Sequence, residues 1–389
     1  MVIPLANSAV APGEYALAST RENSVNAVLD VLASEPFTFT ITEICRITTL
    51  SRPTVTRILN DLIDLDVANA QTASRSHSSG GRRPQIFSLN RFHHCSVVLR
   101  VNYDVVEGWA IDAAGGIIKS VSLPPVSAGD ISDRLAGALT QILQAVDSTV
   151  YAVAVVVMGI VDQGRVVRSE SFPELNSNSW IGQLNAILDD FDQSARVVAL
   201  NDAKVAAKWM YSQCCTLGVG PESMIAIHCS EDFGCGLVFG GNLLEGAHGA
   251  AGEILQDEGS MWSKASSFLR KIEQDQDVSL REFFANAEAY DQENAFIEPL
   301  GRLMGKALSS MVLTLDPDAV AIGGAIVDCG PRLLTAIEQE LRKATPTPPS
   351  VHVSPQGAQS VSEGAKMHVL AEARRTTLQR VLPPADQNH

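Results

Sequence analysis

The stretch that decides the fold of the N-terminal region covers residues 39–90 and reads FTITEICRITTLSRPTVTRILNDLIDLDVANAQTASRSHSSGGRRPQIFSLN. Thr40 with Glu43 three residues later is a capping-box pattern, which predicts that a helix begins there. Only residues 48–50 separate this helix from a second one, which Ser51 is placed to cap. The spacing therefore predicts two short helices joined by a tight turn.

The second helix has an apolar face and a polar face. Apolar side chains recur at the spacing of a buried helix stripe, at Val55, Ile58, Leu59, Leu62 and Ile63. The opposite face holds side chains that can hydrogen bond to base edges in a major groove, namely Arg52, Thr54, Thr56, Arg57 and Asn60. We expect a helix-turn-helix whose second helix reads DNA. The alternative is a solvated helical hairpin that packs on another element.

A basic hairpin follows the two helices. Residues 67–72 and 85–90 can pair as strands around a Ser/Gly-rich loop. Between residues 67 and 103 there is no acid, and the arginines are Arg75, Arg82, Arg83, Arg91 and Arg100. The two glycines before Arg82 and Arg83 let the backbone approach DNA, and such arginines suit the narrow minor groove of A·T-rich tracts. The hairpin therefore predicts the wing of a winged helix.

The charge of the chain is divided unevenly along its length. The net charge is −15, yet the first 91 residues hold eight arginines, no lysine and eight acids, so the excess negative charge lies beyond residue 91. An acidic body repels the phosphate backbone and leaves DNA contact to the basic wing. This distribution favours sparse, selective binding over coating of DNA.

Cysteine usage and hydropathy predict a cytoplasmic protein. The seven cysteines are scattered, odd in number and without a C-x-x-C pattern, so we expect reduced, mostly packed thiols. No apolar run reaches the length needed to span a bilayer, and we expect no membrane contact. Residues 1–20 lack a basic segment ahead of their apolar residues, which predicts a flexible tail instead of a secretory signal.

The rest of the chain predicts a larger body behind the DNA-binding unit. A helix over residues 21–33 completes a winged helix-turn-helix domain at 21–91, and the body covers 92–389. The β-rich run at 151–158 is typical of a strand buried on both faces. Strands and helices then repeat in the same order, which predicts two α/β lobes around a cleft. We place the lobe boundary near 200–220 and expect the C-terminal helix to return to the first lobe.

Four segments resemble the ROK family (repressors, open reading frames and sugar kinases). They are FGCGLVFGGNLLEGAHGAAGEI (233–254), NDAKVAAKWM (201–210), DPDAVAIGGAIV (316–327) and GGRRP (80–84). They occur in the family's order, and the resemblance extends over most of residues 24–380. The resemblance implies an α/β fold, with an N-terminal winged helix-turn-helix followed by a two-lobe, actin-like (ribonuclease H-like) body. The GGRRP segment resembles the wing of the family's repressor branch.

The chain departs from the family's kinases at the phosphate loop. Those kinases carry D-x-G-G-T in the first strand turn of the body, where residues 100–104 of this chain read RVNYD and no glycine occurs before Gly108. A phosphate cradle needs glycine for close backbone approach and free N–H groups. We therefore expect no nucleotide cofactor and no kinase activity.

The zinc ligands of the family are also replaced. The family follows A-G-E with a G-H pair and a C-x-C-G-x-x-G-C loop, whereas here Gln256 stands at the histidine position and the next stretch has no cysteine. Tetrahedral zinc needs three or four nitrogen or sulfur ligands at close spacing. His228, Cys229 and Cys235 are close in sequence but lie at predicted strand positions. We expect no metal.

The sugar-binding residues of the family are partly retained. The resemblance implies that Asn201, Asp202 and Glu253 bind a sugar or sugar-derivative effector, with Gln256 beside them. Trp262 stands where the family has a second glutamate, and a tryptophan either stacks on a sugar or fills a core. Asp202 would be the general base only if kinase activity survived. Otherwise it can cap the helix that follows it, and Glu253 can begin one.

These observations lead to one main hypothesis and two rivals. We expect a DNA-binding transcriptional repressor of carbohydrate-related genes, without cofactor, whose degenerate kinase body forms a homodimer or a dimer of dimers. A dimer is expected because one winged helix reads too few base pairs for selective binding. The rivals are a sugar kinase with an appended DNA-binding unit and a regulator that responds to a protein partner instead of a small ligand.

Overall fold

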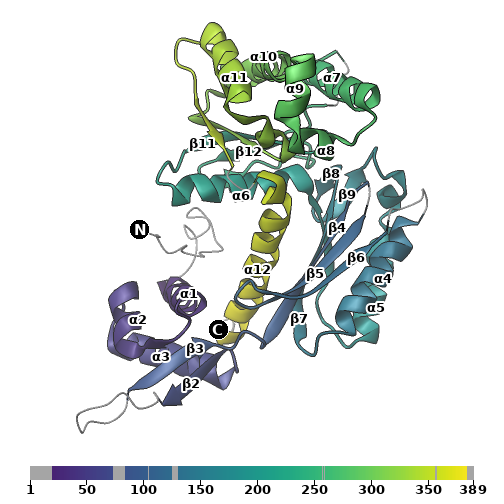
Figure 1. Ribbon diagram of the computed structural model, residues 1–389. Helices are drawn as coiled ribbons and strands as arrows, with labels where there is room; N and C mark the ends of the chain where they lie inside the picture. The colour runs from purple at the N-terminus through teal and green to yellow at the C-terminus, as the bar shows by residue number, and fades with distance from the viewer. Residues whose placement is uncertain are drawn as a thin grey trace. The chain divides into compact units, whose positions relative to one another are not determined.

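The computed structural model describes residues 20–72, 84–103, 105–124, 130–255, 257, 259–354 and 357–382 (Figure 1). These residues form two compact units. The first comprises the described chain up to Val155, Ser177–Val198 and the residues from Lys366 onward, and the second comprises Val156–Asn176 and Ala199–Ala365. The long helix α12 (Ser360–Val381) begins in the second unit and ends in the first.

A winged helix-turn-helix forms the N-terminal part of the first unit. Its elements are α1 (Thr20–Ala33), β1 (Phe39–Thr40), α2 (Ile41–Thr48), α3 (Arg52–Asp64), β2 (Ala68–Thr72) and β3 (Gln85–Leu89). The predicted capping box at α2 is confirmed, because Thr40 Oγ1 accepts from the Glu43 amide at 3.3 Å and Glu43 Oε2 accepts from the Thr40 amide at 2.7 Å. Ser51 Oγ caps α3 by accepting from the Thr54 amide.

The turn and the sheet hold α3 in place. Thr49 adopts a left-handed conformation (φ 61°), which reverses the chain between α2 and α3. The three strands pair in the order β1-β3-β2, with Phe39 opposite Phe87 and Thr72 opposite Gln85. The predicted apolar stripe of α3 faces the core, where the fully buried side chains include Val28, Leu32, Ile44, Val55, Ile58, Leu59 and Leu62. Ile63 lies at the edge of this core and is partly buried.

The C-terminal end of α12 completes the core of the winged helix. Leu378 and Val381 are buried in the same hydrophobic cluster as α1, α2 and α3. An ion pair between Arg374 and Asp30 of α1 stabilises the same contact. Residues more than 300 positions apart in sequence therefore share one core, and the winged helix gains apolar burial that its own sequence does not supply.

A five-stranded sheet covered by two helices forms the rest of the first unit. Its strands lie in the order β10-β7-β4-β5-β6, and β4 and β5 are antiparallel. Strand β7, which lies between β10 and β4, is buried along almost its entire length, as its apolar run predicts. The elements are β4 (His94–Val101), β5 (Val106–Asp112), β6 (Ile117–Leu123), α4 (Ile131–Leu143), β7 (Thr149–Val157), α5 (Ser179–Asp190) and β10 (Val197–Asn201).

The second unit is built on another five-stranded sheet, in the order β13-β12-β11-β14-β15. Strands β11 and β12 are antiparallel, whereas β14 is parallel to β11 and to β15. The strands are β8 (Ile160–Asp162), β9 (Arg165–Arg168), β11 (Ser223–Cys229), β12 (Phe233–Phe239), β13 (Asn242–Leu243), β14 (Ala319–Gly323) and β15 (Ser350–Val353). The helices are α6 (Asp202–Thr216), α7 (Met261–Gln276), α8 (Leu280–Ala285), α9 (Ala287–Asn294), α10 (Ile297–Leu315) and α11 (Gly330–Ala344).

Hydropathy of the helices bears on membrane insertion. Among the residues that the structure describes, no helix has the length and apolar character to cross a bilayer.

Candidate functional site

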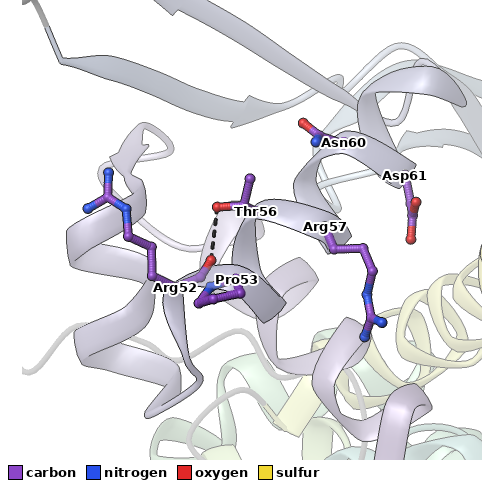
Figure 2. Close-up of a pocket in the computed structure, with 6 residues that line it drawn as sticks. All are labelled: Arg52, Pro53, Thr56, Arg57, Asn60 and Asp61. Carbon is purple, nitrogen blue, oxygen red and sulfur yellow. Dashed lines mark hydrogen bonds between the residues drawn. The ribbon is translucent and has the colours of Figure 1, made fainter.

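The polar face of α3 is exposed and free of acids over its first two turns. Figure 2 shows Arg52 and Arg57 extending in different directions from the helix, with Asn60 a turn further along. All three side chains are exposed, and the first acid of α3 is Asp61, which pairs with Arg21 of α1 at 3.5 Å. Together with neighbouring residues they line a shallow surface hollow of about 530 Å³. Asp61 also lines the hollow, but Arg21 offsets its charge, so the face remains suited to a polyanion.

The two threonines of this face differ from the arginines. Thr56 Oγ1 donates to the Arg52 carbonyl at 2.8 Å (Figure 2). Thr54 Oγ1 lies 2.8 Å from Ser51 Oγ. Both side chains are half-buried. The threonine hydroxyls therefore stabilise the first turns of α3, while Arg52, Arg57 and Asn60 extend beyond them.

The described part of the wing provides a base for the loop that carries its arginines. The pairing of Thr72 with Gln85 is the last on the described hairpin, and Arg75, Arg82 and Arg83 lie outside the described residues. The remaining two arginines of the acid-free stretch bind the body. Arg91 donates to the buried Asp112 at 2.7 Å and Arg100 lies 3.9 Å from Glu107, so these two do not belong to the basic wing.

In the second unit, Asn201 builds the candidate effector site. Its Oδ1 accepts from the Lys204 amide at 2.8 Å, and its Nδ2 donates to the Gly159 carbonyl at 2.8 Å. Asn201 is therefore the N-cap of α6, and the expectation that Asp202 caps this helix is wrong. Because Asn201 is only 8% exposed and both ends of its amide are engaged, its main effect is to join α6 to the segment before β8.

Asp202 and Glu253 form the acidic part of this site. Asp202 is the first residue of α6, and Glu253 lies in a turn; both are half-buried. Glu253 does not begin a helix, contrary to expectation, because the next helix starts at Met261. Burial raises the pKa of Glu253, the carboxylates of Asp202 and Glu170 raise it further, and Lys204 opposes them. Asp202 thus contributes to the electrostatic environment of Glu253.

Two other expected members of the site do not join it in the described structure. Gln256 lies outside the described residues. Trp262 is only 4% exposed and packs against Phe233, with ring centroids 5.3 Å apart. Trp262 therefore fills the core of the second unit, the alternative role that its size allows, and does not offer a face to a sugar.

Lys204 is a site residue that the motifs did not reveal. Its side chain is 6% exposed, and its Nζ donates to the carbonyls of Gly249 at 2.5 Å and Glu245 at 3.5 Å. Burial lowers its pKa, while the carboxylates of Glu245, Glu253 and Asp162 act in the opposite direction. The available signal was a lysine set among small apolar residues in AKVAA, which indicates a buried position.

The turn at the phosphate-loop position is closed by its own hydrogen bond. The amide of Asn102 donates to the Val105 carbonyl at 3.0 Å, so this N–H is not available to a phosphate. Gly108 serves packing, because a Cβ atom there would lie 2.8 Å from both Ile142 Cδ1 and Leu99 Cδ2. Neither residue provides the open backbone of a phosphate cradle.

His228 and Cys235, near the expected zinc position in sequence, are both buried in the second unit. His228 lies 3.0 Å from Ser360 Oγ through Nδ1 and 3.3 Å from Ser230 Oγ through Nε2. Burial raises the pKa of Cys235 to about 12, which favours the thiol over the metal-binding thiolate. Over the described ranges we find no group of three His, Cys, Asp or Glu side chains placed to hold a metal ion.

The fold and the exposed α3 face define a DNA-binding regulator with a kinase-like body. Comparisons with known proteins show which families it resembles. Residues 26–69 match the IclR helix-turn-helix domain, and residues 101–254 match the ROK family. The chain is 21% identical over 326 residues to a xylose repressor of Staphylococcus xylosus, covering 77% of this chain and 82% of that one. It is 24% identical over 179 residues to a glucokinase of Halalkalibacterium halodurans, covering 37% and 53%.

Solved structures show the same architecture. A ROK family transcriptional regulator, described as a homologue of the E. coli MLC protein, superposes with a TM-score of 0.66 at 17% identity, covering 93% of this chain and 99% of that one. A ROK family glucokinase from Streptomyces griseus, solved with glucose and AMPPNP, gives a TM-score of 0.56 at 19% identity, covering 70% and 98%. The predicted fold class is confirmed. The chain therefore combines a helix-turn-helix domain with a ROK-like body, and it is similar to transcriptional repressors of the ROK family.

Proposed function

We propose that this repressor binds an operator through the exposed face of α3 in the major groove, with the wing arginines on the flanking backbone or minor groove. The observation that carries this is the acid-free face of Arg52, Arg57 and Asn60 on a helix whose opposite face forms the core. Genomic footprinting of bound DNA tests it and identifies the operator. A footprint without sequence preference would contradict it.

Selective binding to an operator requires more than one winged helix, because a single winged helix contacts too few base pairs. We therefore propose that the body forms a homodimer, or a dimer of dimers, in the cytoplasm. Light scattering on the free protein and on its operator complex measures the number of chains. A monomer on the operator would contradict the proposal.

The body is proposed to bind a sugar or sugar derivative at Asp202 and Glu253, with Asn201 and Gln256 shaping the site. In support, the similar proteins include a xylose repressor and a glucokinase solved with glucose. Carboxylates accept hydrogen bonds from neighbouring hydroxyls, and a charge-assisted bond contributes about 1.5–3 kcal/mol.

Calorimetry with a panel of aldoses, amino sugars and sugar phosphates tests this effector site. Asp202→Asn should weaken binding of the sugar that the wild type binds, while Asp189→Asn on the surface of α5 serves as the matched control. If no member of the panel binds, or if Asp202→Asn binds equally well, the carbohydrate-effector proposal fails. In that case the favoured hypothesis is that a protein partner, and not a small ligand, controls DNA binding.

Kinase activity is not part of the proposed function. The closed turn at Asn102 and the lack of glycine at residues 100–104 support this. The rival hypothesis, a sugar kinase with a DNA-binding domain, is favoured by Asp202 at the start of α6, the position of the family's general base. A coupled ATP-consumption assay with hexoses decides between them, because product above a no-enzyme control would support the kinase.

A further inference from the structure

Lys204 lies within the candidate effector site, and its burial requires an explanation. It occupies the first turn of α6, two residues after Asp202, and its side chain is only 6% exposed. A buried lysine is rare in proteins because removing the ammonium from water is unfavourable unless hydrogen bonds and opposite charges replace the water.

The carbonyls that accept hydrogen bonds from the Lys204 ammonium belong to one turn of the chain. Its ammonium donates to the carbonyl of Gly249 at 2.5 Å and to that of Glu245 at 3.5 Å. The Glu245 carbonyl also accepts from the Ala251 amide at 3.1 Å, which closes the turn on itself. Lys204 is therefore bonded to both sides of a turn that ends at Glu253, which we call the Glu253 turn (residues 245–253).

The backbone of the Glu253 turn is closely packed against neighbouring strands. Gly249 has φ +67°, and a Cβ atom there would lie 2.1 Å from the carbonyl oxygen of Val161 in β8. Gly252 has φ +89°, and its Cβ would lie 2.3 Å from the carbonyl oxygen of Cys235 in β12. The backbone of the turn thus packs tightly against β8 and β12. The hydrogen bonds of Lys204 link the same turn to α6.

Electrostatics give Lys204 a second effect on the same turn. The carboxylates of Asp202 and Glu170 act on Glu253 with the same sign, and the ammonium of Lys204 acts on it with the opposite sign. The ammonium of Lys204 thus opposes the effect of the neighbouring carboxylates on Glu253. Without it, two half-buried carboxylates would repel each other and favour opening of the turn.

We propose that Lys204 is a positioning residue that holds the Glu253 turn against α6 and so sets the carboxylate of Glu253 beside that of Asp202. The ligand-binding pair is assembled by a lysine that need not touch the ligand. If Lys204 has this role, replacing it should change both the geometry of the turn and the ionisation of Glu253, because both depend on its ammonium.

Because this role rests on the proposed effector site, the test uses the full-length protein without any ligand, so that its failure is distinct from failure of the sugar panel. Hydrogen exchange of peptides covering 244–253 is measured for wild type, Lys204→Met and Lys204→Arg. Lys208→Met, one turn further along α6, is the matched control. We expect exchange about tenfold faster or more in Lys204→Met, and near wild type in Lys204→Arg and Lys208→Met. Equal exchange in all four proteins overturns the proposal.

A carboxyl NMR titration separates positioning from simple structural support. Lys204→Met should raise the pKa of Glu253 further, whereas Lys204→Arg should restore it toward the wild-type value. If the turn opens in Lys204→Met but the pKa of Glu253 does not rise, the ammonium does not act on the pair and the proposal is overturned. If Lys204→Met does not fold, Lys204→Gln, which retains a donor but not the charge, is measured by the same two methods.

Discussion

The face of α3 and the site around α6 use their polar side chains in opposite ways. Arg52 and Arg57 are exposed, and neither forms an ion pair among the described residues. Asn201 and Lys204 are buried, and each joins two segments of the second unit by hydrogen bonds. A surface for a polyanion needs cations that are free to meet it, whereas a small-ligand site needs buried polar groups that first fix its own loops.

The strongest test of this contrast removes the support beneath the DNA-binding face without touching the face. Leu378→Ala should destabilise the winged helix by about 2–4 kcal/mol, because Leu378 of α12 is buried in its core. Hydrogen exchange should accelerate in α1, α2 and α3 and remain unchanged in α10. Leu313→Ala on the exposed face of α10 (63% exposed) is the control. If amide exchange in α1, α2 and α3 is as slow in Leu378→Ala as in Leu313→Ala, α12 does not support the winged helix.

The next largest effect concerns specificity. If Arg57 contacts a guanine edge, Arg57→Ala should weaken operator binding by about 1–3 kcal/mol and binding to random DNA much less. Fluorescence anisotropy on both DNAs measures the difference. Arg302→Ala, an exposed arginine of α10, should alter neither. An equal loss on both DNAs would reassign Arg57 to a phosphate contact.

A smaller effect is expected from the wing, where binding is electrostatic. Replacing Arg82 and Arg83 by alanine should flatten the plot of log affinity against log salt by about 0.9 for each phosphate that the wing no longer neutralises. The double substitution of Arg342 and Lys343 at the end of α11 removes the same charge from the body. If both pairs change the slope equally, the effect comes from net charge and not from the wing.

The sequence predicted the winged helix closely because its signals are local. The capping box at Thr40, the cap at Ser51 and the stripe of α3 each depend on residues within one or two turns. The role of α12 could not be predicted in the same way, because Leu378 reaches a core formed by residues far earlier in the chain.

In the candidate effector site, sequence patterns named the motif residues but not their hydrogen bonds. The pattern allows either Asn201 or Asp202 to cap α6, and only the structure shows that Asn201 does so. Sequence patterns do not identify Lys204, because its partners are backbone carbonyls of a turn with no pattern of its own. Trp262 was ambiguous for a related reason, since size alone does not decide between a core and a ligand surface. Local patterns thus locate such sites, but tertiary contacts decide which atoms remain free for a ligand.

The smallest predicted effect is a change in the pH dependence of stability at Glu253. In the folded protein, burial and the carboxylates of Asp202 and Glu170 hold its pKa above the ordinary value, so the folded state binds the proton more tightly than the unfolded state. Between the ordinary glutamate pKa, about 4.3, and the raised folded value, the contribution of Glu253 to stability therefore falls as pH rises. Glu253→Gln does not titrate and escapes this loss.

The melting temperature of Glu253→Gln should accordingly exceed that of wild type at neutral pH, and the difference should vanish below the ordinary pKa of a glutamate. Glu273→Gln in α7 serves as the control. A higher melting temperature for Glu253→Gln would mean that the carboxylates of the site destabilise the protein without ligand. Their presence would then serve a purpose other than stability, because a ligand rich in hydrogen-bond donors would offset their repulsion. A variant that is less stable than wild type at neutral pH would mean that Glu253 serves the fold, and the contrast with α3 would then lose its functional meaning.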